Sequence, residues 1–123
     1  MTINDYLDME ALDNILEQWA AATHMIAVVL DDEGNFLSNK LGFSRNNVEA
    51  FSESIEVDDV EVATVVGGPL DEDTDEEVVE AAAAILVAAV QNLLEAGYHK
   101  KKYEEAIASF NEEIDGAAAL IKE

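Results

Sequence analysis

The stretch TDEEVVEAAAAILVAAVQNLLEAGYHKKKYEEAIASFNEEIDGAAALIKE, residues 74–123, is rich in Ala, Glu, Leu and Lys and contains no proline. Thr74 is followed three residues later by Glu77, the Ser/Thr-x-x-Glu spacing with which side chains satisfy free amides at a helix start. We therefore predict a helix from about Asp75 to Lys122. At 1.5 Å per residue it would be roughly 70 Å long, whereas a globule of this size has a radius of gyration of about 13 Å. Such a helix cannot lie wholly on its own domain.

Gly97 is the position near the middle of this segment at which the helix could end. A break there would fold the last residues back as a second, antiparallel helix. Residues 98–102 offer no Ser, Thr, Asp or Asn to cap a new helix, and a single glycine inside a helix costs only about 1 kcal/mol. The capping signals therefore favour one continuous helix, with the fold-back arrangement as the alternative.

Apolar residues recur in the second half of the helix at spacings of four and three, the pattern of a coiled-coil seam. Residues 81–90 are apolar at every position, so they fit any frame, and they indicate a helix covered on two sides, by a sheet and by a neighbouring helix. We expect a homodimer paired through this helix. The predicted interface residues are Leu93, Tyr103, Ile107, Phe110, Ile114 and Ile121.

The segment before the long helix predicts one further helix. Leu12, Ile15, Leu16 and Trp19 share one face of residues 8–23 at helical spacing. Asp8 is placed to cap this helix at its start.

Two β-hairpins follow in the sequence. Apolar residues 25–30 and the segment 36–41 flank a turn that contains Gly34, and residues 53–57 and 60–66 flank Asp58-Asp59. Between the hairpins, Ser44 is placed to cap a short helix that reaches Phe51. The expected fold class is α+β, with an N-terminal helix, a small antiparallel sheet of two hairpins, and a long C-terminal helix whose first half packs on the sheet.

Composition narrows the classes of partner and compartment. The chain of 123 residues has 28 acidic and 6 basic residues, a formal net charge of -22, which repels nucleic acid and anionic membranes. No signal peptide is recognisable, and the apolar run of residues 81–90 is too short to span a bilayer. We therefore expect a cytoplasmic protein. The absence of cysteine excludes disulfides and thiolate chemistry.

No motif for catalysis, metal or cofactor binding is recognisable. His24 and His99 lie in unrelated contexts, and Gly67-Gly68 is followed by proline rather than by a phosphate-binding helix. The alternating acids of residues 71–77 are similar to the start of an EF-hand loop, but Glu76 stands at the position that requires glycine. We predict a non-enzymatic protein with no cofactor and no metal.

Two stretches resemble PocR-type sensory domains, which are PAS-like input modules. DMEAL (8–12) with Trp19 and Thr23, followed by AVVLDDEGNFL (27–37), is similar to the opening of that family, and IEVDDVEVATVVGGPL (55–70) to its closing hairpin. Residues 109–123 resemble the start of a signalling helix. In bacteria such modules precede histidine kinases, transcription regulators or chemotaxis-receptor helices.

The resemblance implies a PAS-like core over residues 1–72 and a signalling and dimerisation helix over residues 73–123. It implies a ligand pocket lined by Trp19, Phe36, Phe43 and Phe51. The family's longer, cysteine-containing middle is replaced here by residues 44–52, however, and large aromatics at such positions more often belong to an ordinary core. The expected function is a cytoplasmic sensory input domain that dimerises and relays a small-molecule or partner signal to an output module following residue 123. The alternative is an acidic adaptor or decoy that occupies a partner's basic site and has no ligand pocket.

Overall fold

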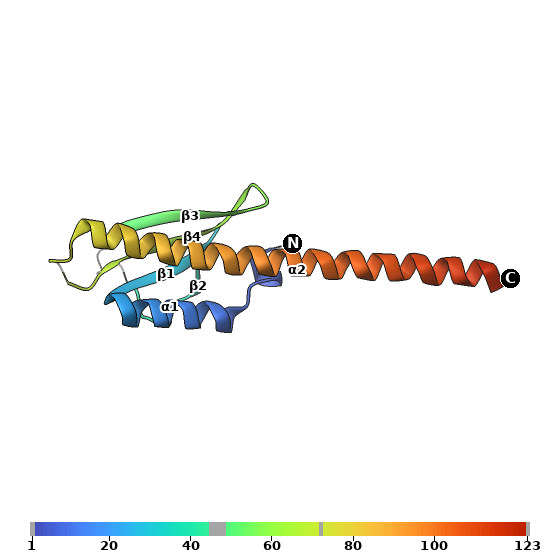
Figure 1. Ribbon diagram of the computed structural model, residues 1–123, viewed down its shortest axis with the longest axis horizontal. Helices are drawn as coiled ribbons and strands as arrows, with labels where there is room; N and C mark the ends of the chain where they lie inside the picture. The colour runs from blue at the N-terminus through green and yellow to red at the C-terminus, as the bar shows by residue number, and fades with distance from the viewer. Residues whose placement is uncertain (1, 45–48, 72, 123) are drawn as a thin grey trace.

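The computed structural model describes residues 2–44, 49–71 and 73–122, with side chains of the last helix described as far as Glu112. Its elements are a 3₁₀ turn η1 (Ile3–Asp5), helix α1 (Met9–Thr23), strands β1 (Met25–Asp31), β2 (Phe36–Ser38), β3 (Phe51–Val57) and β4 (Val60–Pro69), and helix α2 (Glu76–Lys122) (Figure 1). The predicted α+β class is confirmed, including the N-terminal helix, the antiparallel sheet and the long C-terminal helix.

The four strands form one antiparallel sheet in the order β2-β1-β4-β3, so the two predicted hairpins join through β1 and β4. β2 is shorter than predicted and ends at Ser38. The side chain of Asn39 explains why the strand ends early. Its Nδ2 donates to the Phe43 carbonyl at 2.8 Å and its Oδ1 accepts from the Phe43 N–H at 2.7 Å, so the chain closes a loop here instead of extending the strand.

The prediction of a helix reaching Phe51 is wrong at that residue. Phe51 is the first residue of β3, where it pairs with Gly67 of β4. A Cβ added at Gly67 would lie 2.8 Å from the Phe51 ring, so the absence of a side chain at Gly67 leaves room for the ring. Residues 45–48 of the predicted helix lie outside the described residues.

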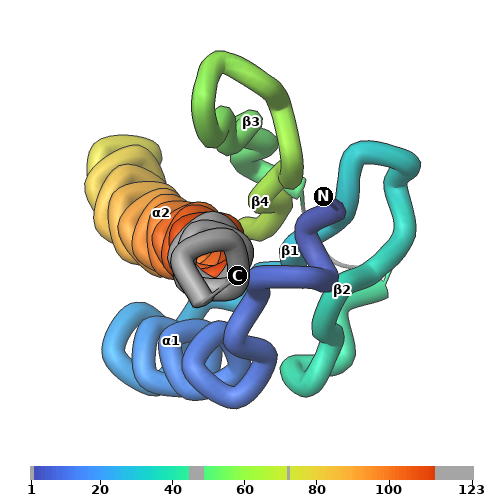
Figure 2. The backbone as a smooth tube through the Cα atoms, turned by 90° about the vertical axis from the view of Figure 1, so that its right-hand side faces the viewer, coloured from blue at the N-terminus to red at the C-terminus, as the bar shows by residue number. Residues whose placement is uncertain are grey.

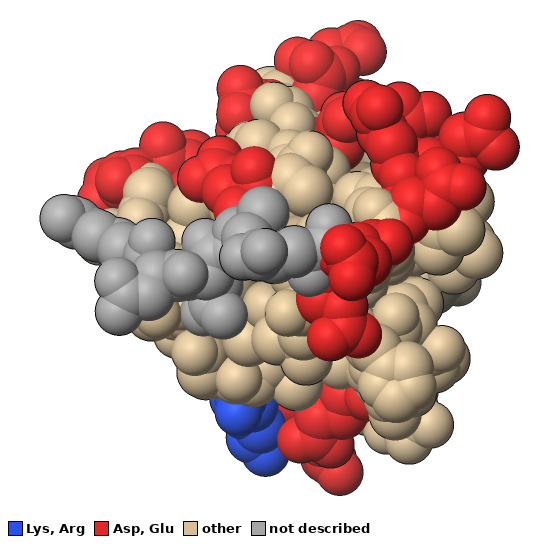
Figure 3. All heavy atoms as spheres, turned by 90° about the vertical axis from the view of Figure 1, so that its left-hand side faces the viewer, with Lys and Arg blue, Asp and Glu red and all other residues tan. Residues whose placement is uncertain are grey.

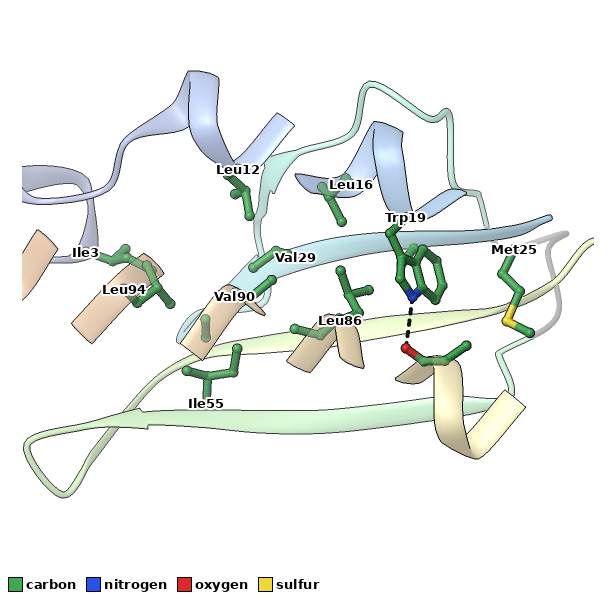
Figure 4. Close-up of a cluster of buried hydrophobic side chains, with 14 of the residues drawn as sticks. Ile3, Leu12, Leu16, Trp19, Met25, Val29, Ile55, Leu86, Val90 and Leu94 are labelled. Atoms are coloured by element: carbon green, nitrogen blue, oxygen red, sulfur yellow. Dashed lines mark hydrogen bonds between the residues drawn. The ribbon is translucent and has the colours of Figure 1, made fainter. Parts of the chain in front are cut away.

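Both helices cover the same face of the sheet. Figure 2 shows α1 and α2 side by side on that face, with α2 closer to β3 and α1 closer to β2. Strand alternation directs one set of side chains into this layer and the other toward the open face. The largest fully buried side chains are Leu12, Leu16, Met25, Val28, Val29, Ile55, Val65, Leu86, Val90 and Leu94 (Figure 4 labels most of them).

The helix starts are capped by aspartates. Asp8 accepts a hydrogen bond from the Ala11 N–H at 3.1 Å, as predicted for α1. At α2 the cap is Asp75, which accepts from the Glu77 N–H at 3.3 Å. The predicted capping role of Thr74 is wrong, because the Thr74 hydroxyl donates to the Asp71 carbonyl within the preceding turn.

The first half of α2 is covered on two sides. The sheet covers one side, and α1 is the neighbouring helix that covers the other. Their contact includes a buried hydrogen bond in which Trp19 Nε1 donates to the Ala82 carbonyl at 2.8 Å (dashed in Figure 4). A third side of the same segment faces solvent, with Val78 and Ile85 exposed.

α2 continues without a break through Gly97, so the fold-back alternative is wrong. The backbone carbonyl of Tyr6 packs so closely on Gly97 that a Cβ there would overlap it. The Tyr6 and Tyr98 rings pack edge to face at 5.5 Å, and the Tyr98 hydroxyl donates to Asp58 Oδ2 at 3.1 Å. Because Gly97 has no side chain, the N-terminal segment can pack against α2. The contacts of Tyr98 with Tyr6 and Asp58 then connect η1 and the β3–β4 turn to α2.

Candidate functional site

The second half of α2 projects beyond the rest of the molecule. Figure 1 shows the helix continuing as a rod past the sheet and α1. Every side chain from Lys102 to Glu112 is exposed. Burying a large apolar side chain contributes about 1.5–3 kcal/mol, so the apolar residues on this rod form a surface suited to a partner.

Among the residues of α2 whose side chains are described, as far as Glu112, five large apolar ones are exposed, and they lie on one side of the helix. Ile85 and Tyr103 are separated by 18 residues, which is about five full turns, and Val78 precedes Ile85 by about two turns. Ile107 and Phe110 follow Tyr103 at about one and two turns. Their exposed fractions are Val78 52%, Ile85 66%, Tyr103 68%, Ile107 41% and Phe110 61%. We call these five residues the outer stripe.

The outer stripe contains three of the six predicted interface residues, Tyr103, Ile107 and Phe110. Leu93 is not on it, since its side chain packs against the hydrophobic core. Ile114 and Ile121 lie on the part of α2 whose side chains are outside the described residues.

Val78 and Ile85 are not among the predicted interface residues. Steps of three and four counted back from Tyr103 reach Leu86 and Val79 instead, and both of these are buried in the core. A signal was present in the sequence: the 18-residue spacing between Ile85 and Tyr103 marks one face of a straight helix. The uniformly apolar neighbourhood of Ile85 concealed it.

The four aromatic residues predicted to line one pocket lie on opposite faces of the sheet. Trp19 is buried among the helices and meets Phe51 edge to face at 6.1 Å. Phe36 and Phe43 border a cavity of about 590 Å³ on the open face. The structure therefore brings the aromatics together in two pairs.

The open-face cavity has an apolar floor and an acidic border. Val28, Leu30 and Val66 contribute to the floor. The carboxylates of Asp31, Asp32, Glu49 and Glu61 are among the lining residues. A volume of this size lies within the range of small-molecule sites, about 300–1,000 Å³.

Acidic side chains cover much of the surface. Figure 3 faces the end of the molecule at which α2 begins, where Asp and Glu spread across the upper part and Lys or Arg atoms occupy a small area at the lower edge. One ion pair links α1 to the segment after β2, between Lys40 Nζ and Asp13 Oδ2 at 3.7 Å. A Ser38 hydroxyl also donates to Asp13.

Ionisation is shifted where the N-terminal segment meets α2. Burial raises the pKa of Tyr6 above its ordinary value, and the neighbouring Tyr98 raises it further. Among the described residues, no group of three His, Asp or Glu side chains is arranged to hold a metal ion.

By length and composition alone, α2 is apolar enough over Glu76–Glu112 to cross a membrane. Core helices of soluble proteins meet the same criterion, and Leu86, Val90 and Leu94 place the apolar part of α2 on the sheet. The architecture is that of a small soluble domain.

Comparison with protein-family models, with curated proteins and with solved structures found no match for this chain.

Proposed function

We propose that this protein is a homodimeric input domain of a cytoplasmic signalling protein, in which the sheet domain receives a signal and α2 pairs with α2 of a second copy. The observation that carries the proposal is the outer stripe. It runs from the globular part of the molecule onto the projecting rod, and it leaves five large apolar side chains in water on one line.

A second copy is the partner that this surface fits best. Two identical helices present the same stripe, and a twofold pair buries each stripe against the other. The stripe also leaves the first half of α2 free to pack on the sheet, because it lies on the third, uncovered side of that segment.

The strands between the open-face cavity and α2 provide the route for the signal. On β4, Thr64 and Val66 line the cavity while Ala63 and Val65 join the core cluster that includes Leu86 of α2. A ligand or partner that displaces one face of β4 therefore displaces the support of α2. A small shift of a helix at a subunit interface is an established form of two-state switching, and an output module joined beyond the rod would receive it.

Sedimentation velocity over a concentration series tests the pairing. We expect a dimer for the unaltered chain and a monomer for the double variant Ile107→Asp and Phe110→Asp, because an unpaired charge cannot be buried in an apolar seam. Losing these side chains from both copies raises the Kd by about a hundredfold or more. Ala108→Asp adds one negative charge on the same helix off the stripe, and it should leave the dimer intact.

Ile85→Asp tests whether the stripe extends to the globular part. Ile85 is exposed in the subunit, so the variant should fold normally, with unchanged circular dichroism, and still dimerise more weakly. An unaltered chain that is monomeric throughout the series would refute the homodimer. A dimer that survives both Ile85→Asp and the Ile107→Asp, Phe110→Asp double substitution would place the interface elsewhere.

A further inference from the structure

A second surface, separate from the outer stripe, lies along the edge of the sheet. A groove of about 970 Å³ runs between the start of β3 and the side of α2 that faces it. On α2 its lining residues recur at every third or fourth position and most are small or apolar. They are Glu76, Val79, Glu80, Ala83, Ala84, Val87, Ala88 and Gln91, opposite Phe51, Ser52 and Glu53 of β3.

β3 is an edge strand. It pairs with β4 on one side, and within the described residues no strand lies on its other side. Ser52 borders both the groove and the open-face cavity, so the edge of β3 is accessible at this point. An accessible edge offers backbone N–H and C=O groups to an added strand. Gln91 occupies one such group further along, by donating through Nε2 to the Glu56 carbonyl.

The charge at the groove selects the occupant. Glu53, Glu76 and Glu80 line the groove, and the described lining residues include no Lys or Arg. A second copy would bring the same acidic edge, on a chain of net charge -22, against this one. A basic segment instead gains from the field.

We propose that the groove binds an extended basic peptide of a partner protein, which adds as a fifth strand to the free edge of β3. Alternate side chains of such a strand point to opposite sides. Small apolar side chains of one set pack on Val79, Ala83 and Val87, while Lys or Arg side chains of the peptide lie near the carboxylates. The proposal does not depend on dimerisation through the outer stripe.

The probe is a fluorescein-labelled peptide of alternating Lys and Val, eight residues long, followed by fluorescence anisotropy with the full chain. We expect saturable binding. A peptide of the same length with Glu in place of Lys should not bind. Replacing the two central Val residues by Pro should weaken binding at least tenfold, because Pro cannot donate to a β-ladder.

Two pairs of protein variants locate the site. Glu80→Lys and Ala84→Trp change the groove, and we expect each to weaken binding at least tenfold. Glu77→Lys makes the same charge change at an exposed position of α2 outside the groove lining, and Ala21→Trp makes the same size change at an exposed position of α1. Both controls should bind within about threefold of the unaltered chain, a difference of about 0.7 kcal/mol or less.

Several results would overturn the proposal. Equal weakening by Glu77→Lys and Glu80→Lys would mean general charge attraction, and unchanged binding by Ala84→Trp or by the Pro-containing peptide would exclude the groove or the added strand. Dissociation of a dimer by Ala84→Trp would assign the groove to a second copy. The Ile107→Asp, Phe110→Asp chain must bind the peptide as the unaltered chain does, so failure of the dimer and failure of the peptide site are distinguishable.

Discussion

Asp31 organises the turn between β1 and β2 through its own side chain. Its Oδ1 accepts from the N–H groups of Glu33 at 2.9 Å and Asn35 at 2.8 Å, and Gly34 has a φ of +84°, a conformation that favours glycine. The hydrogen bond from the Asn35 backbone, with further ones from Glu33 and the Asn35 side chain, lowers the pKa of Asp31 below its ordinary value of 3.8.

This lowered pKa predicts a pH-dependent effect of Asp31→Asn. A carboxyl group whose folded pKa is depressed contributes stability above its unfolded pKa and loses it as pH falls through the folded value. The urea midpoint of the variant should therefore lie below that of the unaltered chain near neutral pH, and the difference should shrink as pH falls below 3.8.

Asp32→Asn is the matched control for this measurement. Asp32 is the exposed neighbour, and its substitution removes the same charge without touching the three hydrogen bonds to Asp31. Repulsion among the other carboxylates is common to both variants. A difference for Asp31→Asn that stays constant down to acidic pH would contradict the role assigned to its carboxylate.

Among the elements, α2 serves two purposes along its length, and Gly97 lies between them. Before Gly97 the helix packs against the core, and from Lys102 to Glu112 its side chains are exposed to solvent. At Gly97 the helix receives the N-terminal segment, whose Ile3 is buried in the core and whose Tyr6 meets Tyr98. Helix propensity therefore disfavours glycine at this position, whereas packing against the Tyr6 carbonyl requires it.

Gly97→Ala tests which demand prevails. Propensity alone predicts stabilisation by about 1 kcal/mol. Overlap with the Tyr6 carbonyl predicts a net loss of about 1–3 kcal/mol, the usual cost of inserting a methyl group into a well-packed site. We expect a lower free energy of unfolding in chemical denaturation.

The same substitution in a chain that begins at Leu7 provides the control. Without the Tyr6 carbonyl the overlap is gone, so Gly97→Ala should stabilise that chain. Destabilisation of equal size in both backgrounds would show that the N-terminal segment is not the cause.

For the whole molecule, the net charge of -22 affects the two proposed interactions in opposite ways. Dimerisation brings two strongly acidic chains together through apolar side chains, so charge repulsion opposes it. Peptide binding joins opposite charges, so the same field favours it. The charge is thus a means of separating the two interactions experimentally.

Raising the salt from about 0.1 M to about 1 M shortens the screening length from roughly 10 Å to roughly 3 Å. The dimer should tighten severalfold, and the complex with the Lys-Val peptide should weaken by at least tenfold, as followed by sedimentation and by anisotropy. A dimer that dissociates in high salt would contradict pairing through apolar side chains.

Local signals along the chain were sufficient for much of the fold. The periodicity of residues 8–23, the turns at Gly34 and at Asp58-Asp59, and the missing cap after Gly97 each involve residues close in sequence. Their interactions are formed within a single helix or hairpin, so the α+β class and the long continuous helix could be predicted. The exposed side of the rod at Tyr103, Ile107 and Phe110 was predictable for the same reason.

Contacts between distant segments decided the rest. Residues 81–90 are apolar on every side, so only packing against the sheet and α1 shows that Leu86 is buried and Ile85 exposed. The placement of Phe36 and Phe51 on opposite faces of the sheet depends on strand register, which a shift of one residue reverses. The edge of β3 and its groove arise from the order of strands and the position of α2, and neither is encoded in the spacing of neighbouring residues.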